Sequence, residues 1–168
     1  MKRIQVAVVA LVLLTALCVP VLWAGAADTA IHFADPVLEA KVREQLNRPE
    51  GELTTEDVKN VENLNFGNEE GSTDRITSLD GLEAFESLFS LSAFNNEIAD
   101  LTPLSGLKRL QYLDLGGNRI SDLSPLKDLN LVGVGLWGNQ ISDLRPLQAM
   151  AGMEYISLDD NSITDITP

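Results

Sequence analysis

The nine residues Asn-Arg-Ile-Ser-Asp-Leu-Ser-Pro-Leu, from Asn118 to Leu126, recur with small changes three more times in this chain of 168 residues. The other copies begin at Asn96, Asn139 and Asn161, so successive copies lie 22, 21 and 22 residues apart. Self-similarity at such a period indicates a solenoid, in which each repeat forms one coil that stacks on the next. The period therefore predicts a long, regular surface, on which a catalytic pocket is uncommon.

An apolar pattern of the form L-x-x-L-x-L-x-x-N leads into Asn118, and similar patterns lead into the other three asparagines. This pattern is typical of leucine-rich repeats. Because side chains alternate along a strand, its L-x-L part predicts short parallel strands that bury one face. The second half of the unit suits a short 3₁₀ turn, since it carries a proline in three copies: Pro103, Pro125 and Pro146. We therefore predict an α/β solenoid, a right-handed leucine-rich repeat coil with a parallel concave β-sheet and short turns on the convex side.

Two rows of polar residues recur with the repeat, and we interpret both as structural. The first row is a predicted ladder of buried amides that bond the backbones of neighbouring coils: Asn96, Asn118, Asn139 and Asn161. We expect Asp74 to take the asparagine place in an earlier, irregular coil. The second row could suggest calcium ligands, but Asp more often caps the turn that follows it: Asp100, Asp122, Asp143 and Asp165. We predict no metal site.

The chain divides into three segments. Residues 1–26 have a basic start, an apolar run and a small-residue site, which is typical of a cleaved secretory signal. A retained membrane anchor is the alternative. For residues 27–60 we predict a small helical cap, because Pro36 begins a helix that runs to about Leu46 and Thr54 begins a second, shorter helix. Residues 61–168 hold about five repeats. The last one stops in mid-coil, so either this is a fragment of a longer protein, which we favour, or the last strand is an unprotected edge.

Composition narrows the function. The formal net charge is −13, and it becomes −15 once Lys2 and Arg3 leave with the signal, so nucleic acid is not an expected partner. Cys18 lies within the signal, which leaves no thiol afterwards, and His32 is the only histidine. Nucleophilic catalysis then lacks a plausible base. We predict a non-enzymatic protein without cofactors, located outside the cytoplasm (secreted, periplasmic or on the cell surface) and not inserted in the membrane after signal cleavage.

The repeat N-x-I-x-D-L-x-P-L, with the cap segments Phe33–Leu38 and Pro49–Thr54, resembles the secreted leucine-rich repeats of bacterial internalins. The resemblance covers nearly all of the chain after the signal. It implies a curved solenoid, secreted or surface-displayed, that binds a protein or a glycan on its concave sheet. The sequence departs from the family pattern in the acidic, glycine-containing insertion at residues 67–73.

The residues that the pattern leaves free on the concave strands identify a candidate binding face. Five of the eight aromatic residues beyond position 27 fall on such positions, and grouped exposed aromatics mark recognition surfaces. Acidic neighbours favour a basic or hydroxyl-rich ligand, and Gly116, Gly133 and Gly135 are expected to leave bare backbone between the rings. The predicted ligand-binding residues are Phe89, Phe94, Tyr112, Asp114, Trp137, Tyr155 and Asp159.

Two other interpretations remain open. The repeats could be a passive spacer in a longer surface protein, with its function in another domain. Alternatively, the 67–74 loop could bind calcium and stabilise an adhesion segment.

Overall fold

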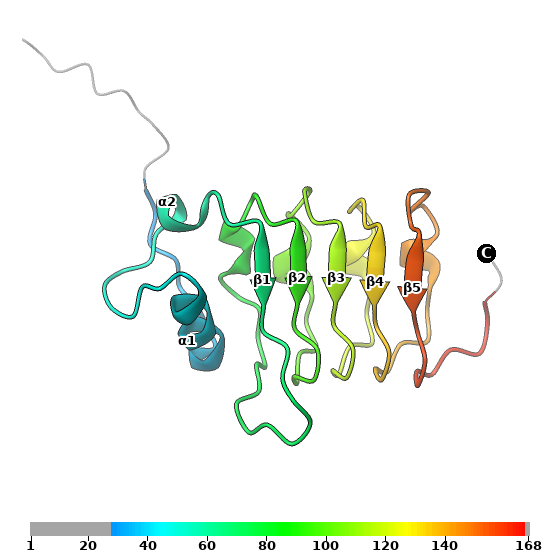
Figure 1. Ribbon diagram of the computed structural model, residues 1–168. Coiled ribbons are helices and arrows are strands. Elements are labelled where there is room, and N and C mark those ends of the chain that lie inside the picture. The colour runs from blue at the N-terminus through cyan, green and yellow to red at the C-terminus, as the bar shows by residue number, and fades with distance from the viewer. Residues whose placement is uncertain (1–27, 167–168) are drawn as a thin grey trace, which may run out of the picture.

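A computed structural model describes residues 28–166, so the expected signal segment at 1–26 lies outside the described residues. Within the described range, five short strands form one parallel sheet in chain order (Figure 1). The strands are β1 (Asn63–Asn65), β2 (Ser90–Ser92), β3 (Tyr112–Asp114), β4 (Gly133–Gly135) and β5 (Tyr155–Ser157). This arrangement confirms the leucine-rich repeat solenoid with its parallel sheet.

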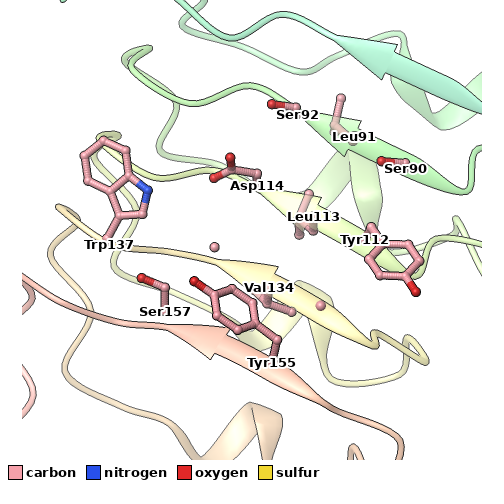
Figure 2. Close-up of a pocket in the computed structure, with 12 residues that line it drawn as sticks. Ser90, Leu91, Ser92, Tyr112, Leu113, Asp114, Val134, Trp137, Tyr155 and Ser157 are labelled. Atoms are coloured by element: carbon pink, nitrogen blue, oxygen red, sulfur yellow. The ribbon is translucent and has the colours of Figure 1, made fainter.

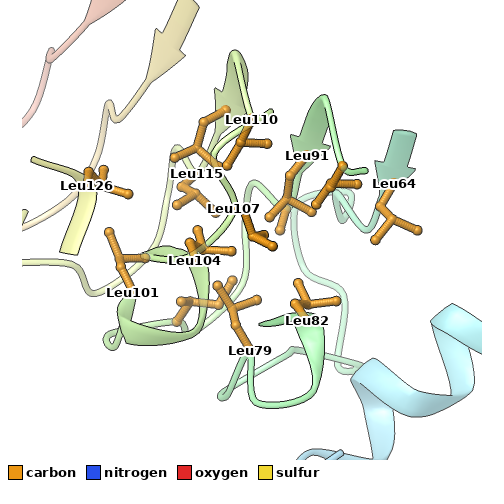
Figure 3. Close-up of a cluster of buried hydrophobic side chains, with 14 of the residues drawn as sticks. Leu64, Leu79, Leu82, Leu91, Leu101, Leu104, Leu107, Leu110, Leu115 and Leu126 are labelled. Atoms are coloured by element: carbon orange, nitrogen blue, oxygen red, sulfur yellow. The ribbon is translucent and has the colours of Figure 1, made fainter. Parts of the chain in front are cut away.

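Each strand points its central side chain toward the core and its two outer side chains toward the concave surface. The central residues of β2, β3 and β4, which are Leu91, Leu113 and Val134, are at most 2% exposed. They pair in register with one another along the sheet. Further leucines from the turns and the opposite wall pack against them, as Figure 3 shows for Leu104, Leu107 and others. The alternation of the strand thus separates a continuous apolar core from a surface whose residues are free to vary.

The wall opposite the sheet is made of 3₁₀ turns, as predicted. They are η1 (Leu82–Ala84), η2 (Thr102–Leu104), η3 (Ser124–Leu126) and η4 (Arg145–Leu147), and the last three carry a proline in their first two positions. Proline is tolerated there because the first N–H groups of a helical turn have no intrahelical acceptor.

A carboxylate precedes each of these three proline-containing turns and accepts a hydrogen bond from backbone N–H two residues later. The residues are Asp100, Asp122 and Asp143, with N···O distances of 2.8 to 2.9 Å. Hydrogen bonds from Ser124 hold the pKa of Asp122 below its ordinary value, and hydrogen bonds from Arg145 lower the pKa of Asp143 to about 2. These aspartates therefore shape the turns, as the sequence predicted.

The backbone turns sharply just before each recurring asparagine. Residues at this corner have positive φ: Asn95 (55°), Gly117 (66°), Gly138 (64°) and Asp160 (54°). Only Gly, Asn and Asp adopt this left-handed conformation readily, and these are the residue types found there.

The recurring asparagines hydrogen-bond across the coils. The amide of Asn118, for example, donates to the carbonyl oxygens of Leu115 in its own coil and Ala93 in the preceding coil, while its oxygen accepts from Ile98 N–H. Asn96, Asn139 and Asn161 have matching partners. Each amide thus joins two neighbouring coils.

The prediction that Asp74 takes the asparagine place in the first coil is wrong. Asp74 is exposed, whereas Asn68 is buried and donates to the side-chain oxygen of Asn96 at 2.7 Å and to the backbone carbonyl of Asp74. An amide can donate to the oxygen of the next asparagine, whereas an ionised carboxylate can only accept. By spacing, Asp74 does correspond to Asn96, because it lies two residues before Ile76 as Asn96 lies two before Ile98. The insertion after Phe66 separates Asp74 from the strand, however, and the buried amide of the first coil is that of Asn68.

The N-terminal cap consists of α1 (Pro36–Gln45) and α2 (Thr55–Val58), and its apolar side chains join the core of the repeats. The side chain of Gln45 donates to the carbonyl oxygen of Asn65 and accepts from its N–H, so α1 also covers the outer edge of β1. Terminal units of solenoids need such covers, because an open strand edge invites pairing with other chains.

One buried carboxylate joins the cap to the first coil. Asp35 is 4% exposed and accepts from Val37 and Leu38 N–H at the start of α1, and from the backbone and hydroxyl of Thr77. Burial raises the pKa of Asp35, but these hydrogen bonds outweigh it and hold the pKa below its ordinary value. Asp35 therefore stabilises the junction in its ionised form.

The sheet is less covered at β5. Ile156, the central residue of this strand, is 37% exposed, although its register partner Val134 is fully buried. No described coil follows β5. The boundaries of the three sequence segments stay predictions.

Candidate functional site

A groove of about 480 Å³ crosses the concave face from β2 to β5 and passes over β4 (Figure 2). The two outward positions of β4 are Gly133 and Gly135, so this strand carries no side chain that would fill the groove. The neighbouring strands supply the walls: Tyr112 and Asp114 from β3, and Tyr155 and Ser157 from β5. Ser90, Ser92 and Trp137 complete the polar and aromatic lining.

The ring of Trp137 rests on the backbone of the neighbouring coil at one end of the groove. A Cβ atom placed on Gly116 would lie 2.0 Å from Nε1 of Trp137, so the indole occupies the space that any larger residue would need. Phe94 covers Gly67 in the same way, with 2.2 Å between its Cε1 and a Cβ on that glycine. The sequence thus places an aromatic beside a glycine in alternate coils. The expectation that Gly116 leaves bare backbone is wrong, because this glycine is buried under Trp137.

Two side chains of β3 lean over the glycines of β4. Tyr112 would be 3.0 Å from a Cβ on Gly133, and one carboxylate oxygen of Asp114 would be 2.6 Å from a Cβ on Gly135. Phe89 supports Tyr112 from behind in an edge-to-face contact, with ring centroids 5.3 Å apart. Such pairs are favoured because the positive edge of one ring meets the negative face of the other. The position of Tyr112 at the edge of the groove is therefore fixed by packing.

The electrostatic character of the groove is negative. Gly116 N–H donates to Asp114 at 3.3 Å. None of the six ion pairs among residues 28–166 includes Asp114, Glu154 or Asp159. The outward strand positions carry neither Lys nor Arg, although Arg109 approaches Glu62 at 3.8 Å on this face near β1. A ligand that supplies a cation would thus find carboxylates without a protein counter-charge.

The predicted binding residues differ in their exposure. Tyr112 (43%), Trp137 (37%) and Tyr155 (63%) are exposed and line the groove together with Asp114. Phe89 and Phe94 are half-buried and serve mainly as packing partners of Tyr112 and Gly67. Asp159 is exposed and does not line the groove, and its carboxylate accepts a hydrogen bond from the Ser157 hydroxyl at 3.1 Å. The sequence pattern identified the positions that face the concave surface, but it did not show which aromatic rings pack on a glycine of the preceding coil.

The groove lining contains three serines, Ser90, Ser92 and Ser157, and no His, Cys or Lys. Across residues 28–166, no group of three or more His, Cys, Asp or Glu is arranged to hold a metal ion. Nor does any helix in that range combine the length and apolar character that crossing a bilayer requires.

Comparisons with known proteins agree with this fold. The family model for leucine-rich repeats (two copies) matches residues 86–128. An internalin from Listeria monocytogenes is similar in structure, with a TM-score of 0.63 and 26% identity over 80% of this chain and 46% of its own. A leucine-rich repeat protein from Leptospira interrogans gives a TM-score of 0.57 and 25% identity, over 65% of this chain and 28% of its own.

This chain therefore spans less than half the length of either protein. No curated protein sequence matches it. The chain has the leucine-rich repeat fold and is internalin-like.

Proposed function

We propose that this internalin-like leucine-rich repeat chain is a non-catalytic binding module that recognises a protein ligand in the groove over β4. The observation that carries the proposal is the gathering of Tyr112, Trp137 and Tyr155, all exposed, around one concave groove. Tyr and Trp are enriched among the residues that dominate binding energy at protein interfaces. Leucine-rich repeat solenoids present their concave sheets as extended binding surfaces.

A glycan is the second candidate ligand. Flat aromatic rings beside the hydroxyl groups of Ser90, Ser92 and Ser157 offer both the stacking surface and the hydrogen-bond partners that a sugar ring requires. The uncompensated carboxylates favour a protein with a basic surface over a neutral glycan, because they add attraction only toward a cation. A location outside the cytoplasm belongs to the same proposal and is supported by the basic and apolar start of the sequence.

The test is a binding screen on arrays of extracellular proteins and of glycans. The wild-type chain is compared with the double variant Tyr112→Ala and Trp137→Ala. Truncating two central aromatics costs about 2 kcal/mol or more at such interfaces, which is at least about thirtyfold in affinity. Asp128→Asn is the control, since Asp128 is exposed in the segment that follows η3, outside the groove lining. Equal binding by the double variant and the wild type would remove this face as the binding site, and a spacer role would then be the better interpretation.

A further inference from the structure

The groove over β4 is chemically different at its two ends. Tyr112 and Tyr155 stand at the first outward position of their strands, and Asp114 and Ser157 stand at the third (Figure 2). Positions two residues apart on a strand are separated by about 6.6 Å. The groove therefore passes from a tyrosine end to an end where Asp114 and Ser157 lie near Trp137, within the length of one long side chain.

Room for an inserted group lies between the side chains of β3 and those of β5. β3 and β5 are two strand spacings apart, or about 9.6 Å, because β4 lies between them. Tyr112 leans over Gly133 from β3, and no atom of Tyr155 comes within 4 Å of a Cβ placed on that glycine, so the open part of the groove lies between Tyr112 and Tyr155.

We propose that this groove receives an arginine side chain of the protein ligand, an inference that rests on the proposed function. The aliphatic stem of the arginine packs between Tyr112 and Tyr155, and its guanidinium group reaches Asp114. Arginine suits the site better than lysine, because its planar guanidinium stacks on aromatic faces and pairs with a carboxylate through two parallel hydrogen bonds.

Charge complementarity carries this choice of occupant. Asp114 has no cationic partner among the described residues, and Glu154 and Asp159, which flank β5 two coils away, add negative charge. A neutral ligand would leave these charges uncompensated, whereas a guanidinium would pair with the carboxylate that stands inside the groove.

The test uses three short peptides that differ at one residue: acetyl-Gly-Gly-X-Gly-Gly-amide with X as arginine, lysine or citrulline. Citrulline has the shape of arginine but no charge. Binding to the 168-residue chain is followed by NMR, through the amide signals of Gly133 and Gly135 and the indole signal of Trp137. The arginine peptide is expected to shift these signals and to bind roughly tenfold more tightly than the citrulline peptide. Asp114→Asn should remove that difference, and the control Asp128→Asn should retain it.

Three results would overturn the inference: equal binding of arginine and citrulline, equal binding of arginine and lysine, or shifts confined to residues outside the groove. Failure here is distinguishable from failure of the proposed function. If Asp114→Asn binds the array ligand normally while the Tyr112→Ala and Trp137→Ala variant does not, the face binds its ligand without an arginine. If both variants bind normally, the proposed function fails as well.

Discussion

Replacing Gly116 with alanine should displace Trp137 from the surface on which it rests. The new Cβ would lie 2.0 Å from Nε1 and 2.1 Å from Cε2 of the indole, whereas non-bonded heavy atoms prefer about 3.5 to 4.0 Å. The backbone of Gly116 is fixed, because its carbonyl oxygen accepts from Asn95 N–H at 2.8 Å. The ring must therefore move outward by about 1.5 to 2 Å.

The magnitude follows from the area that the ring loses. A tryptophan can bury up to about 250 Å², and Trp137 is 37% exposed, so roughly 150 Å² is covered at present. Losing half of that area costs about 2 kcal/mol at about 25 cal/mol per Å². Alanine also restricts the unfolded chain, which offsets about 0.4 to 1 kcal/mol. We expect a net loss of about 1 kcal/mol in the free energy of unfolding, or a few degrees in Tm.

The assay combines denaturant unfolding with tryptophan fluorescence in a Trp23→Phe background, where Trp137 is the only tryptophan. Gly116→Ala should move the Trp137 emission toward that of a solvated indole. Gly106→Ala is the matched control, because a Cβ on Gly106 meets nothing within 4 Å. In a Trp137→Ala background the cost of Gly116→Ala should disappear, since contacting residues are energetically coupled. An unchanged emission spectrum, or the same cost with and without Trp137, would refute the packing of this ring on Gly116.

Three further substitutions test the interior of the fold. Asp35→Ala should lower the free energy of unfolding by about 2 to 4 kcal/mol at pH 7. Because the pKa of Asp35 is depressed in the folded state, the wild-type advantage is complete above the unfolded pKa of about 4 and declines as the pH falls through the folded value. Denaturation curves of the two proteins that stay equally separated at pH 7 and pH 2 would contradict this role. Asn118→Ala should lower the free energy of unfolding by about 2 to 4 kcal/mol, because it leaves Ile98 N–H buried without an acceptor. Calorimetry that shows no loss of stability would exclude a contribution of the asparagine ladder. Leu113→Ala should lower the free energy of unfolding in urea by about 3 kcal/mol, and Ile156→Ala by clearly less, because Leu113 is 2% exposed and Ile156 is 37% exposed. Equal losses for the two variants would mean that Ile156 is covered in solution.

Much of the fold was predictable because it depends on local repetition. The spacing of the asparagines and the L-x-L segments predicted the parallel strands, and the prolines predicted the 3₁₀ turns of η2, η3 and η4. The first coil was less predictable. There the insertion separates Asp74 from the strand, and burial of Asn68 in its place became visible only once both could be placed against Asn96.

The candidate site was only partly predictable. The alternation of strand residues indicated which positions face the concave surface, and Tyr112, Trp137 and Tyr155 are indeed exposed on it. It could not show that Phe94 and Trp137 lie on glycines of the preceding coil, because that contact depends on side-chain direction across 21 residues or more.

The sequence by itself determined the coil, because a period of 21 to 22 residues with alternating apolar positions can bury its leucines only by stacking. The tertiary structure alone decided where the surface is hollow. A groove forms over β4 because Gly133 lies between Tyr112 and Tyr155, and Gly135 lies between Asp114 and Ser157. The register of the stacked coils sets which residues become neighbours across strands.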